Sequence, residues 1–243
     1  MLISRNFMKD STKLNFGFWN FNLDFWKGNS FRHDDANIFD TNVLIVDTSA
    51  MNPEFYYLST KQKKTIRNHW INALSHLRNV EYLMTTHQID QEFFDTVCQM
   101  PQLKGLYIKW GKIESIQNLQ NLQNLKHLYF GSNPRIESLH GIEHLKNIEH
   151  LELENFKSIN DFSKLGKLHS LKTLTIAGSV NSPATKMNDL YFLENLNNLE
   201  ELVLGISLIN KDTTPLHKYA KLERLFLPTL IEKKLFKEID ENK

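Results

Sequence analysis

The feature that most constrains the fold of this chain is the pattern LxxLxL, which occurs seven times. Other apolar residues replace some of the leucines, and two of the matches end in Thr or Phe. The matches are VEYLMT at Val80, LKGLYI at Leu103, LKHLYF at Leu125, IEHLEL at Ile148, LKTLTI at Leu171, LEELVL at Leu199 and LERLFL at Leu222. Their starts are separated by 23, 22, 23, 23, 28 and 23 residues. Chance Leu-rich helices do not keep such a register, so the pattern indicates repeated structural units.

Apolar residues recur at steps of three before each match, as in the run from Ile136 to Leu151, and a step of two ends the unit at Leu153. Steps of three suit a 3-10 segment, and a step of two suits a strand. Each unit is therefore predicted to be one coil of a solenoid, with parallel strands on one face and tight turns on the other. No unit can bury its own leucines, so neighbours share the core and both ends need a cover.

Residues 80–229 resemble the leucine-rich repeat proteins, and the short units resemble the internalin-like bacterial class most. The resemblance implies an α/β fold, a curved right-handed solenoid with a parallel concave sheet and with 3-10 or short helices on the convex side. The chain departs from the family eight residues after each start, where Asn is usual. Only Asn133 fits, and the other residues there are Gly111, Phe156, Ser179, Ser207 and Leu230. We therefore expect less regular turns.

Residues 1–79 do not repeat and are predicted to form an N-terminal cap of strands and a helix. LNFGFWNFNLDFW (14–26) and TNVLIVDTS (41–49) are typical of strands. Residues 59–77 have helical spacing, with Ser59 or Thr60 as the N-cap. The alternative is a separate module whose aromatic side chains contact a partner.

The C-terminal end and the long interval between repeats also depart from the pattern. Residues 230–243 are predicted to form a charged closing helix. About five extra residues around GSVNSPATKMND are predicted to form a loop at a rim of the strand face, either a tolerated insertion or a binding loop.

Composition limits the classes of function. The 243 residues include 29 basic and 28 acidic side chains, and the net charge of +1 gives no general attraction to nucleic acid or to an anionic membrane. The single cysteine excludes an internal disulfide framework. The start of the chain has no apolar segment of signal-peptide length, and no run approaches about 18 apolar residues. We therefore expect a soluble, cytoplasmic and monomeric protein.

The residues between and beside the strand leucines are predicted to face solvent on the concave side, where neighbouring strands align them in columns. The central column reads Met84, Tyr107, Tyr129, Glu152, Thr175, Val203 and Phe226. Large aromatic residues on an exposed strand face are enriched in protein interfaces. The predicted partner-binding patch is Tyr82, Met84, Tyr107, Lys109, Trp110, His127, Tyr129, His150, Glu152 and Glu154. Alternatively, the aromatic residues only pack on each other across the strands.

Candidate chemical groups are few. His127, His150 and Glu152 are possible ligands for zinc or iron, but the pattern favours an ordinary polar patch. Glu152 and Glu154 could act as a carboxylate pair, although nothing in the sequence encloses them in an apolar pocket. Cys98 lies in an apolar segment, which predicts a buried thiol.

Other motifs do not support catalysis or nucleic-acid binding. HGIEH (140–144) lacks the Glu that follows the first His in the HExxH zinc motif and is interpreted as solvated surface. Lys61, Lys63, Lys64 and Arg67 are interpreted as the charged face of a helix. No Gly-rich phosphate loop and no GxSxG occurs, so we expect no enzyme activity and no cofactor.

These observations favour a non-catalytic protein–protein interaction module that binds a protein partner on its concave strand face. A more specific alternative is a cytoplasmic immunity or inhibitor protein that neutralises a toxin or effector. A third alternative is a metal-binding protein or enzyme that uses His127, His150 and Glu152.

Overall fold

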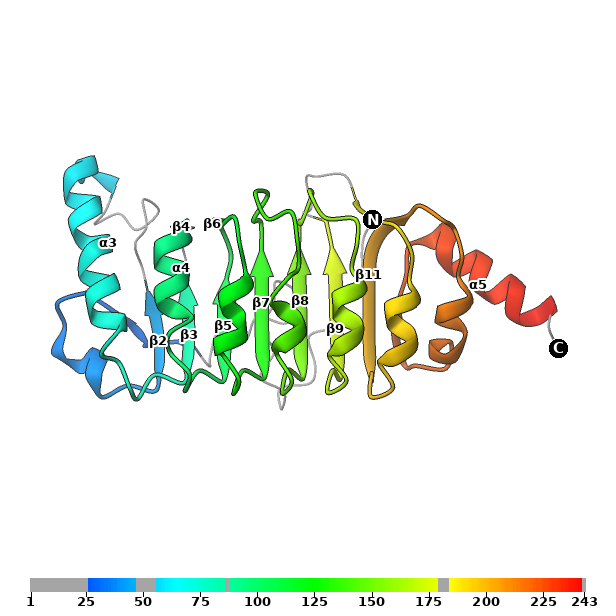
Figure 1. Ribbon diagram of the computed structural model, residues 1–243, viewed down its shortest axis with the longest axis horizontal. Helices are drawn as coiled ribbons and strands as arrows, with labels where there is room; N and C mark the ends of the chain where they lie inside the picture. The colour runs from blue at the N-terminus through cyan, green and yellow to red at the C-terminus, as the bar shows by residue number, and fades with distance from the viewer. Residues whose placement is uncertain (1–25, 47–55, 86–87, 179–183, 242–243) are drawn as a thin grey trace.

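The computed structural model describes residues 26–46, 56–85, 88–178 and 184–241. They form one long sheet with a layer of helices, mostly 3-10, packed on one side of it (Figure 1). The strands are β1 (Ser30–Phe31), β2 (Val43–Val46), β3 (Tyr82–Thr85), β5 (Gly105–Ile108), β7 (His127–Gly131), β8 (His150–Glu154), β9 (Thr173–Ala177), β10 (Thr185–Met187), β11 (Glu201–Leu208) and β12 (Arg224–Phe226). A separate pair joins β4 (Ile89–Asp90) to β6 (Gly111–Lys112).

The helical layer follows the same repeat. It contains η3 (Gln117–Asn121), η4 (Ile142–His144), η5 (Ser163–Lys167), η6 (Tyr191–Asn195) and η7 (Thr214–Tyr219), and the first repeat carries α4 (Gln91–Val97) instead. η2 (Ala36–Phe39) and α3 (Thr60–Leu74) precede the repeats, and α5 (Thr229–Glu241) follows them. The predicted alternation of strands with 3-10 segments is therefore confirmed.

The strand register shows how the repeats stack. The order is β1-β2-β3-β5-β7-β8-β9-β11, and all pairs are parallel. The residue at the fourth position of every match is a leucine, and it lies beside its counterpart in the next strand. This row reads Leu83, Leu106, Leu128, Leu151, Leu174, Leu202 and Leu225. An aligned row of this kind is what a constant repeat produces, and the chain has the leucine-rich repeat fold.

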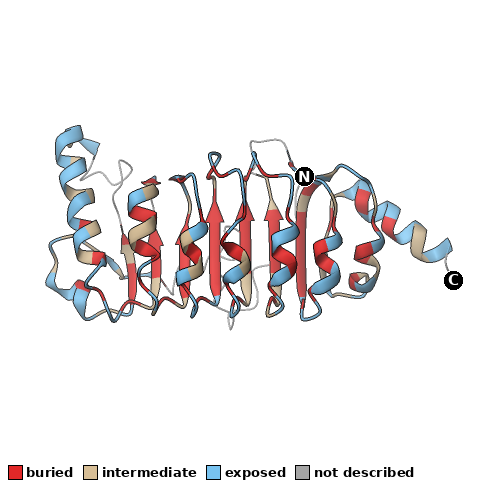
Figure 2. Ribbon diagram, in the orientation of Figure 1, coloured by how far each residue is buried: buried red, intermediate tan, exposed pale blue. Residues whose placement is uncertain are grey.

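The main core lies between the sheet and the helical layer. It contains the leucines of the repeats, the apolar residues of the 3-10 segments, and Trp70 and Leu74 of α3. Figure 2 shows the strands largely buried, while exposed residues gather on the helices and turns. Full burial of one such side chain stabilises the fold by about 1.5–3 kcal/mol, so the stability is spread along the solenoid.

At the position where the family usually carries Asn, two different side chains are buried in two of the repeats. Phe156 is buried in the core, where its ring packs edge-to-face on Phe130 with centroids 5.5 Å apart. Asn133 is also buried, and its Nδ2 donates to the carbonyl of Gly131 at 2.7 Å. A Cβ on Gly111 would lie 1.9 Å from Asn133 Oδ1, so glycine in one coil makes room for the amide of the next.

A regular ladder of polar side chains lies at the opposite edge, where the strands begin. We call it the strand-start ladder, and it consists of Asn79, Gln102, Asn124, Asn147, Ser170 and Asn198. Each side chain donates to a backbone carbonyl of a preceding segment, for example Asn147 to Gln123 at 2.8 Å and Asn198 to His169 at 2.8 Å. The ladder therefore satisfies backbone carbonyls of the turns.

The cap residues join the same sheet as the repeats, because β2 pairs with β3. Ser59 caps α3 with a capping box formed with Gln62, which confirms the predicted N-cap. Arg67 donates to Asp90 through two nitrogens, at 2.7 and 2.5 Å, and so ties α3 to the start of α4. Of the predicted strands, 14–26 lies outside the described residues except for Trp26, and 41–49 contains β2.

Two predictions nearer the C-terminus have different outcomes. The closing helix is confirmed as α5. Within GSVNSPATKMND (178–189), where about five extra residues are predicted to form a loop, residues 179–183 lie outside the described residues, so the loop stays a prediction. Thr185–Met187 form β10, because β11 continues beyond its pairing with β9 and offers Ile206–Leu208 as partners.

Candidate functional site

We call the side of the sheet that points away from the helical layer the strand face. The predicted columns exist on it. Met84, Tyr107, Tyr129, Glu152 and Thr175 are neighbours in successive strands, as are His127, His150 and Thr173. Gly131, Glu154 and Ala177 form a third row. The repeat therefore brings residues that are distant in sequence onto one surface.

The predicted exposure of this patch is wrong for most of its members. Tyr129 is 0% exposed, Tyr107 8% and Glu152 5%, and Met84, His127 and Glu154 are also buried. Tyr82, Lys109 and His150 are partly buried, and Trp110 is 38% exposed. The aromatic end of the strand face is packed as a second apolar cluster, which contains Trp26, Val43, Met84, Tyr107 and Tyr129, with Ile45 and Tyr82 against it. Trp26 comes from outside the repeats, so the period alone could not predict the cover.

The two tyrosines of the central column, Tyr107 and Tyr129, stack on each other. The rings of Tyr107 and Tyr129 lie 4.2 Å apart with an interplanar angle of 17°. Burial raises the pKa of both phenols, and the charge of Glu152 raises that of Tyr107 further. Both side chains therefore stay neutral at physiological pH and can donate hydrogen bonds.

An ion pair lies next to the stacked rings. Lys109 Nζ donates to Tyr129 Oη at 2.7 Å and to the carboxylate of Glu154, and Tyr129 donates to the same carboxylate. The side chains of Lys109 and Glu154 are only 13% and 10% exposed. A Cβ on Gly131 would lie 2.7 Å from Tyr129 Oη and 3.1 Å from Glu154 Oε2, so the contact needs glycine there. We call Lys109, Tyr129 and Glu154 the Lys109 network.

The histidine pair does not form a metal site with Glu152. The rings of His127 and His150 stack at 4.6 Å with an interplanar angle of 11°, and His150 Nδ1 lies 2.9 Å from Thr173 Oγ1. Parallel rings direct their lone pairs along their own planes instead of toward a shared ion. Within the described ranges, no group of three His, Cys, Asp or Glu side chains could hold a metal ion. The metal hypothesis therefore gains no support.

Glu152 and Glu154 are buried, which corrects the expectation that nothing encloses them. Glu154 is engaged by Lys109 and Tyr129, so it is not a spare acid or base. Cys98 is buried as predicted, and burial raises the pKa of its thiol well above the usual value. His140 and His144 are exposed on the helical side, also as predicted.

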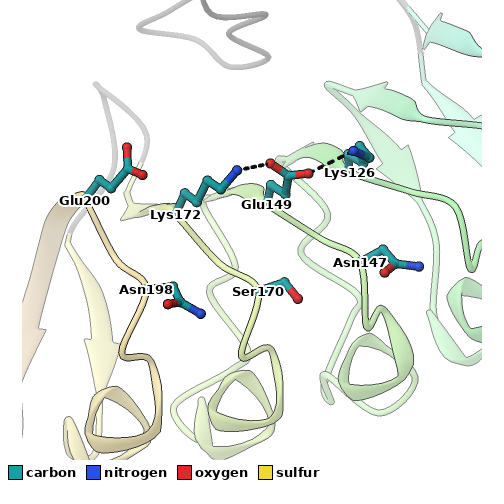
Figure 3. Close-up of a pocket in the computed structure, with 7 residues that line it drawn as sticks. All are labelled: Lys126, Asn147, Glu149, Ser170, Lys172, Asn198 and Glu200. Carbon is teal, nitrogen blue, oxygen red and sulfur yellow. Dashed lines mark hydrogen bonds and ion pairs between the residues drawn. The ribbon is translucent and has the colours of Figure 1, made fainter.

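A groove of about 400 Å³ runs along the strand-start edge, and no sequence argument pointed to it (Figure 3). Its lining is Lys126, Asn147, Glu149, Ser170, Lys172, Asn198 and Glu200. Glu149 pairs with Lys172 at 2.5 Å and with Lys126 at 3.0 Å, and these lysines lower its pKa to about 2. The three uncharged residues belong to the strand-start ladder, so the lining mainly connects neighbouring coils.

In the part of the chain that the structure describes, no helix has the length and apolar character needed to span a bilayer.

Comparison with protein-family models and with curated proteins finds no match. Among solved structures, the chain is similar to internalin C2 of Listeria monocytogenes, at 19% identity, 63% coverage of this chain, 72% coverage of that chain and a TM-score of 0.39. For internalin F of the same organism these values are 20%, 66%, 59% and 0.35. For a leucine-rich repeat protein of Leptospira interrogans they are 15%, 82%, 58% and 0.35. The chain thus spans less than two thirds of the last two proteins. The assignment of the leucine-rich repeat fold follows from the strand register itself.

Proposed function

We propose that this chain is a non-catalytic interaction module whose strand face binds a segment of a partner protein. One observation supports this most. The strand face carries an apolar cluster that is separate from the main core, and this cluster already holds Trp26, a side chain from outside the repeats. A surface that buries an aromatic residue of its own chain has the shape and chemistry to bury one from another protein.

The surroundings of the cluster fit the same role. The Lys109 network supplies charged and hydroxyl groups in fixed positions beside the stacked tyrosines. Trp110 remains 38% exposed next to Lys109, whose Nζ lies 5.9 Å from the Trp110 ring centroid. Aromatic anchors with oriented polar groups around them are typical of protein interfaces.

The finer expectations from the sequence stay predictions. These are the role as a neutraliser of a toxin or effector, the cytoplasmic location and the monomeric state. None of them is needed for the proposal, which concerns the face that binds and not the identity of the partner.

Site-specific photo-crosslinking tests the proposal. A photoreactive phenylalanine analogue replaces Trp110, which is exposed beside Lys109. In a matched control it replaces Tyr191, which is 49% exposed on η6 in the helical layer. Both proteins are irradiated in a lysate of the native host, and crosslinked products are identified by mass spectrometry. We expect one protein to be captured from position 110 and not from position 191. Equal capture from both positions, or none from position 110, would contradict the proposal.

A further inference from the structure

The first part of helix α3 adds no buried side chain to the core. The helix spans Thr60–Leu74, and its buried residues are Trp70 and Leu74. Residues 60–69 are all exposed or partly buried. In Figure 1 the start of α3 extends beyond the ends of β2 and β3. The last part of the helix therefore covers the end of the core, while its beginning projects from the molecule.

Two exposed tyrosines lie directly before this projection. Tyr56 is 69% exposed and Tyr57 is 87% exposed, and their rings meet edge-to-face with centroids 5.4 Å apart. Rings that are exposed to this extent add little to the stability of the fold. A phenol, which combines an apolar ring with a polar hydroxyl, suits a boundary between an apolar phase and water.

Three lysines follow in the first turn and a half of the helix. Lys61, Lys63 and Lys64 span about 5 Å along the helix axis, given a rise of about 1.5 Å per residue. Among the residues that the structure describes, none of these lysines forms an ion pair, and the first turn of α3 contains no acidic residue. Arg67, one turn later, differs because it pairs with two carboxylates of the first repeat. The three lysines thus form an uncompensated positive patch.

The position of this patch is unfavourable for the helix itself. Cations near the start of a helix are repelled by its macrodipole, so stability alone would favour acidic residues there. The capping box of Ser59 and Gln62 already satisfies backbone groups at the helix start. The feature that needs an explanation is therefore the set of exposed side chains and not the helix N-terminus.

We propose that these side chains form a docking site for a membrane surface that contains anionic lipids. We call Tyr56, Tyr57, Lys61, Lys63 and Lys64 the α3 tip. The inference goes beyond the proposed function and does not rest on it, because α3 packs on the main core and not on the strand face.

The shape and the chemistry of the α3 tip favour a bilayer over other anionic partners. A flat surface contacts only the parts of a protein that project toward it. Tyrosine rings are enriched at the level of lipid headgroups, and neighbouring lysines are attracted to anionic lipids. Single-stranded nucleic acid instead uses rings on which successive bases stack along a groove, whereas the planes of Tyr56 and Tyr57 cross at 81°.

Attraction to the membrane must come from the α3 tip alone. The net charge of the chain is +1, so the molecule as a whole is not drawn to an anionic surface. Three lysines and two tyrosines give weak and reversible binding that depends on salt.

Co-sedimentation with vesicles tests the site on the full chain. One set of vesicles contains equal parts of phosphatidylglycerol and phosphatidylcholine, and the other contains phosphatidylcholine alone. We expect binding to the anionic vesicles only, at about 50 mM salt, and loss of binding at about 500 mM salt because the charges are screened. The triple variant Lys61→Gln, Lys63→Gln, Lys64→Gln should bind at least about tenfold more weakly. Tyr56→Ser combined with Tyr57→Ser should weaken binding about threefold.

A second triple variant is the matched control. Lys112→Gln, Lys157→Gln and Lys221→Gln remove the same number of charges from exposed positions outside the α3 tip. This protein should bind as the unaltered chain does. Urea denaturation checks the fold of both triple variants, and the tip variant should be at least as stable as the unaltered chain because it loses cations that oppose the macrodipole.

A spin label shows whether the tip enters the lipid interface. Cys98 is buried, and burial raises the pKa of its thiol, so a nitroxide reagent labels Tyr57→Cys selectively. With anionic vesicles, the label at position 57 should become more accessible to oxygen and less accessible to a water-soluble nickel complex. The same label on Tyr191→Cys, which is exposed on η6, should not change.

Four results would overturn the inference. The first is that the unaltered chain does not bind anionic vesicles at low salt, and the second is that both triple variants lose binding equally. The third is that the label at position 57 stays as accessible to the nickel complex as the label at position 191. The fourth is that oligothymidine binds as tightly as the vesicles and loses its binding in the tip variant, because the patch would then attract any polyanion. The spin-label measurement keeps all tip lysines, so it decides the question if the tip variant does not fold.

Discussion

The two faces of the same sheet differ in how regularly residue types recur from strand to strand. On β7, Leu128 and Phe130 point into the main core, whereas Tyr129 lies in the cluster on the strand face. The core side carries a leucine at the same register position in each of the seven repeat strands, but the strand face changes from Met84 to Tyr107, Tyr129 and Glu152 along one row. Residues on both faces are buried, yet only the core side repeats the same residue type from strand to strand. Packing of the repeats therefore fixes the core side, and the variation on the strand face gives this chain its individual surface chemistry.

The largest loss of stability is expected from a substitution on the core side of β7. Leu128→Ala removes a buried side chain and leaves a cavity among well-packed neighbours. We expect a loss of about 3 kcal/mol in the free energy of unfolding, measured by urea denaturation. Tyr129→Phe, one residue along, keeps the ring and should cost about 1 kcal/mol through its lost hydroxyl. Equal losses in the two variants would show that the faces do not differ as described.

A second variant tests the Lys109 network by crowding it. Gly131→Ala places a methyl group 2.7 Å from Tyr129 Oη, and we expect a cost of about 2 kcal/mol in the free energy of unfolding. Tyr129→Phe in the same chain removes the oxygen that the methyl group meets. The double variant should therefore lose less than the sum of the single losses in a double-mutant cycle. Simple additivity would indicate that Gly131 is needed for another reason.

The strand-start ladder provides a smaller test, away from both faces. Asn147→Ala deletes the hydrogen bond to the Gln123 carbonyl, and we expect a loss of about 1 kcal/mol in the free energy of unfolding. Asn121→Ala, at an exposed position on η3, is the control and should change stability by less than about 0.5 kcal/mol. The comparison by urea denaturation is informative only if both variants keep the same m-value.

The smallest effect is a pH dependence at the groove. Hydrogen bonds from Lys172 and Lys126 lower the pKa of Glu149 from 4.5 to about 2. A depressed pKa stabilises the fold above about pH 4.5, and this stabilisation is lost as the pH falls toward about 2. Because the lysines are about half exposed, we expect less than about 1 kcal/mol.

The free energy of unfolding of Glu149→Gln should therefore differ from that of the unaltered chain at neutral pH and approach it below about pH 3. Glu137→Gln, at an exposed carboxylate, should show no such convergence. A constant difference for Glu149→Gln at every pH would mean that its ion pairs contribute nothing.

Much of the fold could be predicted from the sequence because it depends on periodic leucines and local signals. The LxxLxL register predicted the parallel strands, and Ser59 with Gln62 marked the start of α3. The strand-start ladder had a signal that was missed, a polar residue directly before nearly every match, as at Asn124 and Asn147.

The candidate site was predicted only in part. Alignment in columns follows from the repeat, so the neighbours of Tyr129 and Glu152 were predicted correctly. The burial of these two residues was not predicted, because the repeat period says nothing about side chains from outside the repeats, such as Trp26, which lies in the same apolar cluster as Tyr129. Contacts made by residues outside the repeats follow no sequence period, so they could not be predicted from the repeat pattern.

The strand-start ladder has a consequence for how such a chain can change in length. Each rung ties one coil to a preceding one, as Asn147 does with Gln123 and Ser170 with Lys146. A duplicated unit of 23 residues brings its own donor and its own acceptor, so it can enter the stack without leaving a polar group unpaired. Duplication of whole coils could therefore widen the surface offered to other proteins one unit at a time, while each older coil keeps its contacts.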